Sequence, residues 1–185
     1  PNKMVPQSVT QVDVAIVGCG PAGVVLAALL GQAGIRVHIC DRLPGVYEIP
    51  RAISLDHEIL RVFQQLGVID QVMPFTEPFT NSEFLGVDGQ LIRRMTMVQA
   101  PYPQGYTPSV VFSQPPVERI LRKHVESLPQ VSMALGLTMT EFSQDAHGVT
   151  LNYDDASQVH ARYAVACDGG ASAMRESLGI DFEDL

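Results

Sequence analysis

The chain has 185 residues, 46% of them hydrophobic, which suffices for a globular domain with a substantial core. Twelve basic and twenty acidic residues leave a formal net charge of −8, which argues against nucleic acid or an anionic membrane surface as a partner. The apolar run over 22–30 is too short to span a bilayer. Residues 1–11 show no signal-peptide pattern, and we expect them to form a disordered lead-in.

The cysteines and histidines show no spacing typical of a metal or redox site. Cys19, Cys40 and Cys167 contain no C-x-x-C pair, so we expect no metal. We expect reduced thiols in a cytoplasmic protein. No Ser/His/Asp arrangement or carboxylate pair stands out, and the catalytic residues stay unknown.

The first predicted elements form a β-α-β unit around a glycine turn. A buried strand over 12–17 leads into Gly18-Cys19-Gly20-Pro21-Ala22-Gly23, which opens a helix that ends near residue 30. A second apolar strand over 35–40 ends at Asp41. Gly18 permits the sharp turn, Gly20 has no Cβ to block a pyrophosphate, and Gly23 lets the helix pack closely on the strand. The helix N-terminus attracts phosphates, and Asp41 is placed to accept hydrogen bonds from a ribose, so we predict a site for an ADP-containing cofactor.

The middle of the chain alternates predicted helices with loops and one hairpin. In chain order we predict a loop over 42–52, a helix over 55–66 that Ser54 caps and Gly67 ends, an irregular segment over 68–80, a hairpin over 82–98, a proline-rich loop over 100–108, and a helix over 114–128 that Ser113 caps.

Short strands dominate the C-terminal third. We predict them at about 131–135, 137–143, 148–153 and 157–160, followed by an apolar strand over 163–167 that ends at Asp168-Gly169-Gly170. Ligands collect at the carboxyl ends of parallel strands, which makes Asp168 a second candidate for the site. The order of elements predicts an α/β fold, a Rossmann-type sheet with an antiparallel insertion.

With these motifs, the chain resembles the N-terminal part of the single-component FAD-dependent aromatic hydroxylases, the p-hydroxybenzoate hydroxylase type. It is most similar to the 3-(3-hydroxyphenyl)propionate hydroxylase-like branch. The resemblance covers nearly all of residues 13–180. It rests on the glycine turn with Asp41, on Pro50-Arg51-Ala52, on Phe112-Ser113-Gln114-Pro115, and on the run from Cys167 to Arg175.

The resemblance implies a Rossmann-like FAD-binding domain with a β-meander and the start of an antiparallel substrate-domain sheet. Residues 12–80 would be the FAD-binding βαβ unit and its following helix, 81–110 the start of the substrate-domain insertion, and 111–185 the continued FAD-binding domain. A plain NAD dehydrogenase is disfavoured, because the β-meander and the Asp168 motif have no place in that domain.

The resemblance also implies which residues hold the cofactor, FAD. The ADP half would lie at Gly18, Gly20, Pro21, Ala22, Gly23, Asp41 and Arg42. Arg51 would contact FAD near the path of the nicotinamide, as suits a permanent cation beside a diphosphate. Gln114 would touch the ribityl chain, Asp168 and Gly169 the ribityl or ribose region, and Arg175 is implicated with NAD(P)H.

The implied activity is hydroxylation of a small phenolic acid with NAD(P)H as co-substrate and O2, through a C4a-hydroperoxide of the flavin. Alternatives are another FAD monooxygenase (a ubiquinone-pathway hydroxylase, an epoxidase, a halogenase or an antibiotic-modifying enzyme) or an inactive FAD-binding fragment. Homo-oligomerisation stays open. The family's later Gly-Asp motif has no counterpart in this sequence. We therefore expect an N-terminal piece of a longer enzyme, which does not hydroxylate alone.

Overall fold

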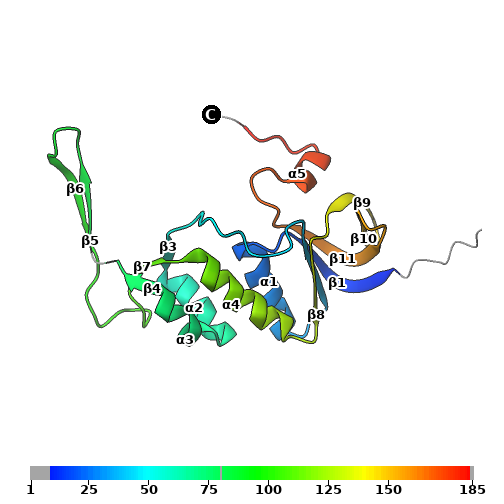
Figure 1. Ribbon diagram of the computed structural model, residues 1–185, viewed down its shortest axis with the longest axis horizontal. Helices are drawn as coiled ribbons and strands as arrows, with labels where there is room; N and C mark the ends of the chain where they lie inside the picture. The colour runs from blue at the N-terminus through cyan, green and yellow to red at the C-terminus, as the bar shows by residue number, and fades with distance from the viewer. Residues whose placement is uncertain (1–8, 80, 184–185) are drawn as a thin grey trace, which may run out of the picture. The chain divides into compact units, whose positions relative to one another are not determined.

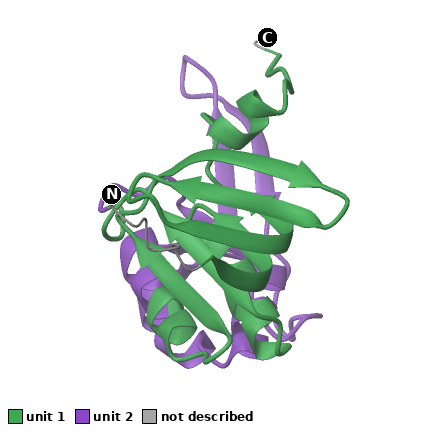
Figure 2. Cartoon of the chain, turned by 90° about the vertical axis from the view of Figure 1, so that its right-hand side faces the viewer, with its two compact units in different colours: residues 1–47, 121–185 green, residues 48–120 purple. Residues whose placement is uncertain are grey.

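The computed structural model describes residues 9–79 and 81–183 (Figure 1). The chain divides into two compact units, residues 1–47 with 121–185 and residues 48–120 (Figure 2). The lead-in predicted over 1–11 lies outside the described residues as far as residue 8. Its last two residues were predicted wrongly, because Thr10 and Gln11 already pair with the neighbouring strand.

The first unit contains a six-stranded sheet with the strand order β8-β2-β1-β11-β10-β9. Its strands are β1 (Thr10–Val17), β2 (Val37–Asp41), β8 (Val131–Leu135), β9 (Met139–Asp145), β10 (Gly148–Tyr153) and β11 (Gln158–Ala166). Strands β8, β2, β1 and β11 run parallel, and β10 and β9 continue the sheet in antiparallel fashion. The predicted α/β fold with a β-meander is confirmed.

The β1–α1–β2 unit forms where the glycine turn predicts it. Helix α1 (Pro21–Gln32) begins with proline at its first turn, where the missing N–H costs nothing. It packs against β1, β2 and β8. Strand β1 is apolar and buried along most of its length, as expected of a parallel strand covered on both faces.

Strand pairing changes the predicted C-terminal third in two ways. The strands predicted over 157–160 and 163–167 are one strand, β11, which pairs with β1 from Val159 to Ala166. The exposed residues Arg162 and Tyr163 interrupt its apolar pattern, but the pairing with β1 continues on both sides of Arg162. The segment predicted over 131–135 is a strand, but it joins the parallel part of the sheet beside β2.

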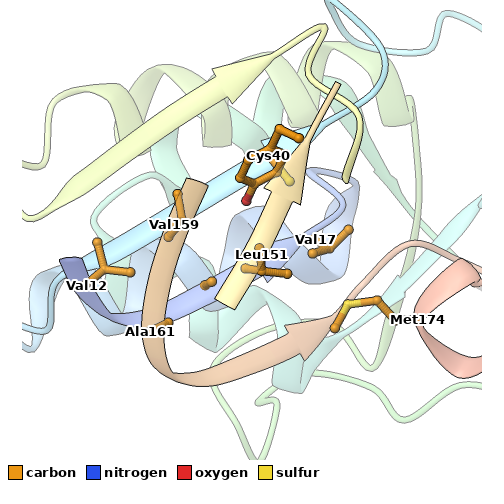
Figure 3. Close-up of a cluster of buried hydrophobic side chains, with 9 residues drawn as sticks. Val12, Val17, Cys40, Leu151, Val159, Ala161 and Met174 are labelled. Atoms are coloured by element: carbon orange, nitrogen blue, oxygen red, sulfur yellow. The ribbon is translucent and has the colours of Figure 1, made fainter. Parts of the chain in front are cut away.

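A cluster of buried side chains forms one part of the hydrophobic core of this unit (Figure 3). Its members are Val12, Ala15, Val17, Cys40, Leu151, Tyr153, Val159, Ala161 and Met174. Met174 comes from helix α5 (Ala173–Ser177), a short element that the sequence did not predict. A fully buried side chain of this size contributes about 1.5–3 kcal/mol, so Met174 anchors the segment after Asp168 to the sheet.

The second unit contains a three-stranded sheet, a hairpin and short helices. Its elements are β3 (Ser54–Asp56), α2 (His57–Leu66), α3 (Ile69–Val72), the 3-10 helix η1 (Met73–Phe75), β4 (Thr76–Pro78), β5 (Asn81–Leu85), β6 (Leu91–Thr96) and β7 (Ser109–Phe112). The strand orders are β3-β7-β4 and β5-β6, and all of these pairs are antiparallel. The division between the units falls within helix α4 (Gln114–Glu126).

Two predictions for this unit were wrong and two were confirmed. Ser54 lies in strand β3, and Asp56 caps α2 by accepting a hydrogen bond from the N–H of Ile59 at 2.9 Å. The segment 68–80, predicted as irregular, contains α3, η1 and β4, because β4 finds a partner in β7. Gly67 ends α2 with φ +76°, as predicted, and the predicted hairpin over 82–98 is β5 and β6.

Candidate functional site

Two glycines of the turn are required by packing against backbone. Gly18 has φ +104°, and a Cβ there would lie 2.2 Å from the carbonyl oxygen of Cys167. A Cβ on Gly23 would lie 1.9 Å from the carbonyl oxygen of Gly18. Neither neighbour can move without disturbing the sheet, so both positions exclude a side chain.

Gly20 is different, because a Cβ there would meet nothing within 4 Å. Gly20 is also the N-cap of α1, and no side chain caps this helix end. The N-terminus of a helix presents backbone N–H groups and a partial positive charge. This combination of an open approach and an uncapped helix end suits a phosphate group.

The ends of three adjacent strands bring the predicted residues of the first unit together. The N–H of Gly18 donates to the carbonyl of Cys40 at 2.8 Å, and the N–H of Cys167 donates to the carbonyl of Val17 at 2.7 Å. The glycine turn follows β1, Asp41 is the last residue of β2, and Asp168 follows β11. All three therefore lie at the same edge of the sheet, where ligands of open α/β folds bind.

Asp41 ties the glycine turn to the following loop. Its Oδ2 accepts a hydrogen bond from the N–H of Cys19 at 2.7 Å, and its Oδ1 accepts one from the N–H of Leu43 at 2.8 Å. A carboxylate offers about four acceptor positions, so Asp41 retains capacity for ribose hydroxyls. Arg42, the next residue, is exposed.

Asp168 carries a buried oxygen that is unsatisfied among the residues described. Its Oδ2 lies 3.3 Å from the N–H of Met174, whereas Oδ1 is inaccessible to water and accepts no hydrogen bond. A buried acceptor without a donor is costly, and a ligand hydroxyl would satisfy it. Gly169, with φ +86°, leaves open space beside it, since a Cβ there would contact nothing within 4 Å.

Arg175 is folded back on the Asp168–Gly170 turn. Its Nη1 donates to the carbonyl of Gly170 at 2.7 Å, and its guanidinium lies 5.1 Å from the centre of the Phe182 ring. These contacts brace the turn. Contact of Arg175 with NAD(P)H stays a prediction.

In the second unit, Arg51 and Gln114 lie together. Gln114 Oε1 accepts hydrogen bonds from the N–H groups of Arg51 and Ala52, at 2.7 and 2.8 Å. Gln114 Nε2 donates to Glu118 Oε1 at 2.6 Å. The amide that the resemblance assigns to the ribityl chain thus holds the Arg51 segment, and its contact with a flavin stays a prediction.

The sequence reasoning missed Arg122, a buried cation at the glycine turn. Its Nη2 donates to the carbonyl of Cys19 at 2.8 Å, and its side chain is 7% exposed. A signal was present: Gln114, Glu118 and Arg122 recur every four residues of α4, so these polar residues share one face. A buried polar stripe of this kind indicates a structural or binding role.

Cys40 and Cys167, in the first unit, are poor nucleophiles. Burial raises the pKa of the Cys40 and Cys167 thiols, and the nearby carboxylate of Asp168 raises that of Cys167 further. Both thiols are therefore protonated near neutral pH, which disfavours covalent catalysis by either.

In the part of the chain that the structure describes, no three His, Cys, Asp or Glu side chains gather in a way that could hold a metal ion. Within the same residues, no helix is both long and apolar enough to cross a membrane.

Comparison with known proteins gives consistent matches. A family model described as "FAD binding domain" matches residues 11–184. The chain is 38% identical over 175 residues to a 3-(3-hydroxy-phenyl)propionate/3-hydroxycinnamic acid hydroxylase of Mycobacterium sp. (strain JLS), covering 94% of this chain and 30% of that relative. It is also 38% identical over 175 residues to the enzyme of the same name from Comamonas testosteroni, covering 92% and 29%.

A crystal structure of the flavin-dependent monooxygenase PieE in complex with FAD and substrate has a similar fold. The TM-score is 0.80 at 26% sequence identity, and the match covers 95% of this chain and 33% of PieE. This chain thus spans about a third or less of the length of these three proteins.

Proposed function

This chain belongs to the FAD binding domain family, and from that premise we propose that the whole protein is a flavoprotein hydroxylase of small phenolic acids. It would use NAD(P)H and O2, and its substrate would resemble 3-(3-hydroxyphenyl)propionate, as the names of relatives at 38% identity suggest. These 185 residues would supply the binding of FAD. The same proposal places the protein in the cytoplasm, where free thiols such as Cys40 stay reduced.

The unsatisfied Oδ1 of Asp168 is the observation that carries the assignment of residues to FAD. A sugar or ribityl hydroxyl donating to this atom would remove the cost of its burial. Gly20 leaves the N-terminus of α1 open to the diphosphate, and Asp41 has acceptor capacity left for the ribose.

Bound FAD would supply the hydride and oxygen chemistry, which amino-acid side chains do not provide. The side chains described above would bind and orient the cofactor. Arg122 would hold the glycine turn through the carbonyl of Cys19, and Arg175 would hold the Asp168–Gly170 turn through the carbonyl of Gly170. Both cations lie in the unit that would receive the diphosphate, and they favour binding of an anion.

The test uses the intact protein. It should purify with the absorption spectrum of oxidised flavin, and 3-(3-hydroxyphenyl)propionate should stimulate its oxidation of NADH or NADPH and yield a hydroxylated product. A colourless protein that cannot be loaded with FAD would overturn the proposal. Equal, slow oxidation with every phenol tested would retain the flavoprotein and overturn the phenolic-acid substrate.

A further inference from the structure

We propose that Glu118 is a positioning residue that orients the amide of Gln114, and through it holds the backbone around Arg51. The significance of this arrangement for cofactor binding rests on the proposed function. The arrangement itself consists of contacts within residues 48–120 and does not depend on that function.

The three partners form a continuous hydrogen-bonded chain. Glu118 Oε1 accepts from Gln114 Nε2 at 2.6 Å, and Gln114 Oε1 accepts from the N–H groups of Arg51 and Ala52 at 2.7 and 2.8 Å. The spacing of four residues places Gln114 and Glu118 on one face of α4. Both side chains are buried, at 4% and 3% exposure, so water is a poor substitute for either partner.

The chemistry of the groups permits only one orientation of the amide. The backbone N–H groups are donors and require the amide oxygen, whereas the Glu118 carboxylate only accepts and requires the amide NH2. An inverted amide would set donor against donor at Arg51 and acceptor against carboxylate at Glu118. Glu118 therefore excludes the inverted state, and the charge on its carboxylate strengthens the bond that does so.

The segment held in this way is anchored at a second point. The N–H of Phe112 donates to the carbonyl of Ile53 at 3.0 Å, next to the two N–H groups that Gln114 holds. The side chain of Arg51 is exposed, so an exposed cation is carried on a fixed backbone. Fixing a ligand-binding segment in advance lowers the entropy lost on binding, which favours an anionic ligand at Arg51.

Trypsin reports on this segment directly, because it cleaves the Arg51–Ala52 bond between the two N–H groups that Gln114 holds. We expect E118Q to speed this cleavage about tenfold. A neutral amide at position 118 loses the charge-assisted bond from Gln114 and can present its own NH2 to that side chain, which weakens the hold on Arg51 and Ala52. Cleavage after Arg42, in the other unit, is the internal reference. E126Q is the matched control, because Glu126 lies on the same helix and is exposed.

Exchanging the two side chains provides a rescue. In Q114E/E118Q the side chain at position 118 can donate to a carboxylate at position 114, which still accepts from the two backbone N–H groups. We expect Q114E alone to speed cleavage, because it sets two carboxylates, at positions 114 and 118, against each other. We expect the double variant to return to the wild-type rate. Unchanged cleavage in E118Q, or a rise matched by E126Q, would overturn the proposal. If E118Q unfolds the whole chain, failure of the double variant to restore the wild-type rate overturns it.

The affinity for FAD separates this inference from the proposed function. Binding of FAD, followed by flavin fluorescence, should weaken in E118Q and recover in Q114E/E118Q. Faster cleavage at Arg51 with an unchanged affinity supports the positioning role of Glu118 and overturns the assignment of Arg51 to FAD.

Discussion

Gly20 and Gly23 of the glycine turn should respond differently to an added methyl group. Gly20→Ala adds a Cβ that meets nothing within 4 Å, at backbone angles of φ −75° and ψ −173° that alanine adopts freely. Gly23→Ala adds a Cβ 1.9 Å from the carbonyl oxygen of Gly18, well inside van der Waals contact. The first variant should fold normally and bind FAD poorly, whereas the second should fold poorly.

The magnitudes follow from these contacts. For Gly20→Ala, loss of the glycine preference at the N-cap and the reduced entropy of the unfolded chain roughly cancel, so the free energy of unfolding should change by less than about 1 kcal/mol. A methyl group in the path of the diphosphate should weaken FAD binding by about tenfold or more, by the usual cost of overpacking. Overpacking at Gly23 should cost about 3 kcal/mol, which lowers Tm by about 6–12 °C in a chain of this size.

Two measurements decide the matter: thermal unfolding of the FAD-free protein followed by circular dichroism, and FAD titration followed by flavin fluorescence. An equal fall in Tm for Gly20→Ala and Gly23→Ala would show that the contacts of Gly23 with the backbone do not make it the less tolerant position. Wild-type affinity of Gly20→Ala for FAD would show that the open space at Gly20 is not the cofactor's path.

Three further predictions concern His38, Asp168 and Arg122. Burial lowers the pKa of His38 below its ordinary value of about 6.5. As the pH drops below about 6.5, the unfolded chain therefore binds a proton at this position before the folded chain does. The free energy of unfolding should fall over this pH range. His38→Gln should flatten the dependence of Tm on pH, and an unchanged slope, or the same flattening in a variant of the exposed His147, would contradict this. Asp168→Ala should raise the Kd for FAD about tenfold. Its Tm should change little, because the bond lost from the N–H of Met174 to Oδ2 is long, at 3.3 Å, and Oδ1 has no partner to lose. Wild-type retention of FAD would count against the role of Asp168. Arg122→Met should also raise the Kd for FAD about tenfold, because it releases the carbonyl of Cys19, and Arg122→Lys should recover part of the affinity. Equal affinities for FAD in the wild type and both variants would exclude Arg122 from the site.

Local patterns were sufficient for the fold class. The apolar strand over 12–17, the glycine turn and the apolar strand before Asp41 each depend on residues close in sequence, and the structure has β1, α1 and β2 there. The hairpin over 82–98 was predictable for the same reason, since its turn and its alternation are local.

Elements that depend on a distant partner were not predictable in the same way. Strand β7 is short and forms because β3 and β4 flank it, and β11 continues past Arg162 because β1 pairs with it on both sides of that residue. Propensity is a weak guide where pairing decides the outcome. Ser54 illustrates this, because pairing with Val111 placed it in a strand instead of at a helix cap.

The candidate site likewise contains some features that are local in the sequence and others that depend on distant partners. The sequence by itself predicted that the glycine turn, the strand before it and Asp41 form a dinucleotide site, because these features follow one another along the chain. Only the tertiary structure distinguished the glycines, since the clash at Gly18 comes from Cys167, far away in sequence. It also showed that Arg122 donates to the glycine turn and that Glu118 accepts from Gln114. The role of a buried polar side chain depends on its hydrogen-bond partner, and here the fold brings partners together that the sequence pattern does not identify.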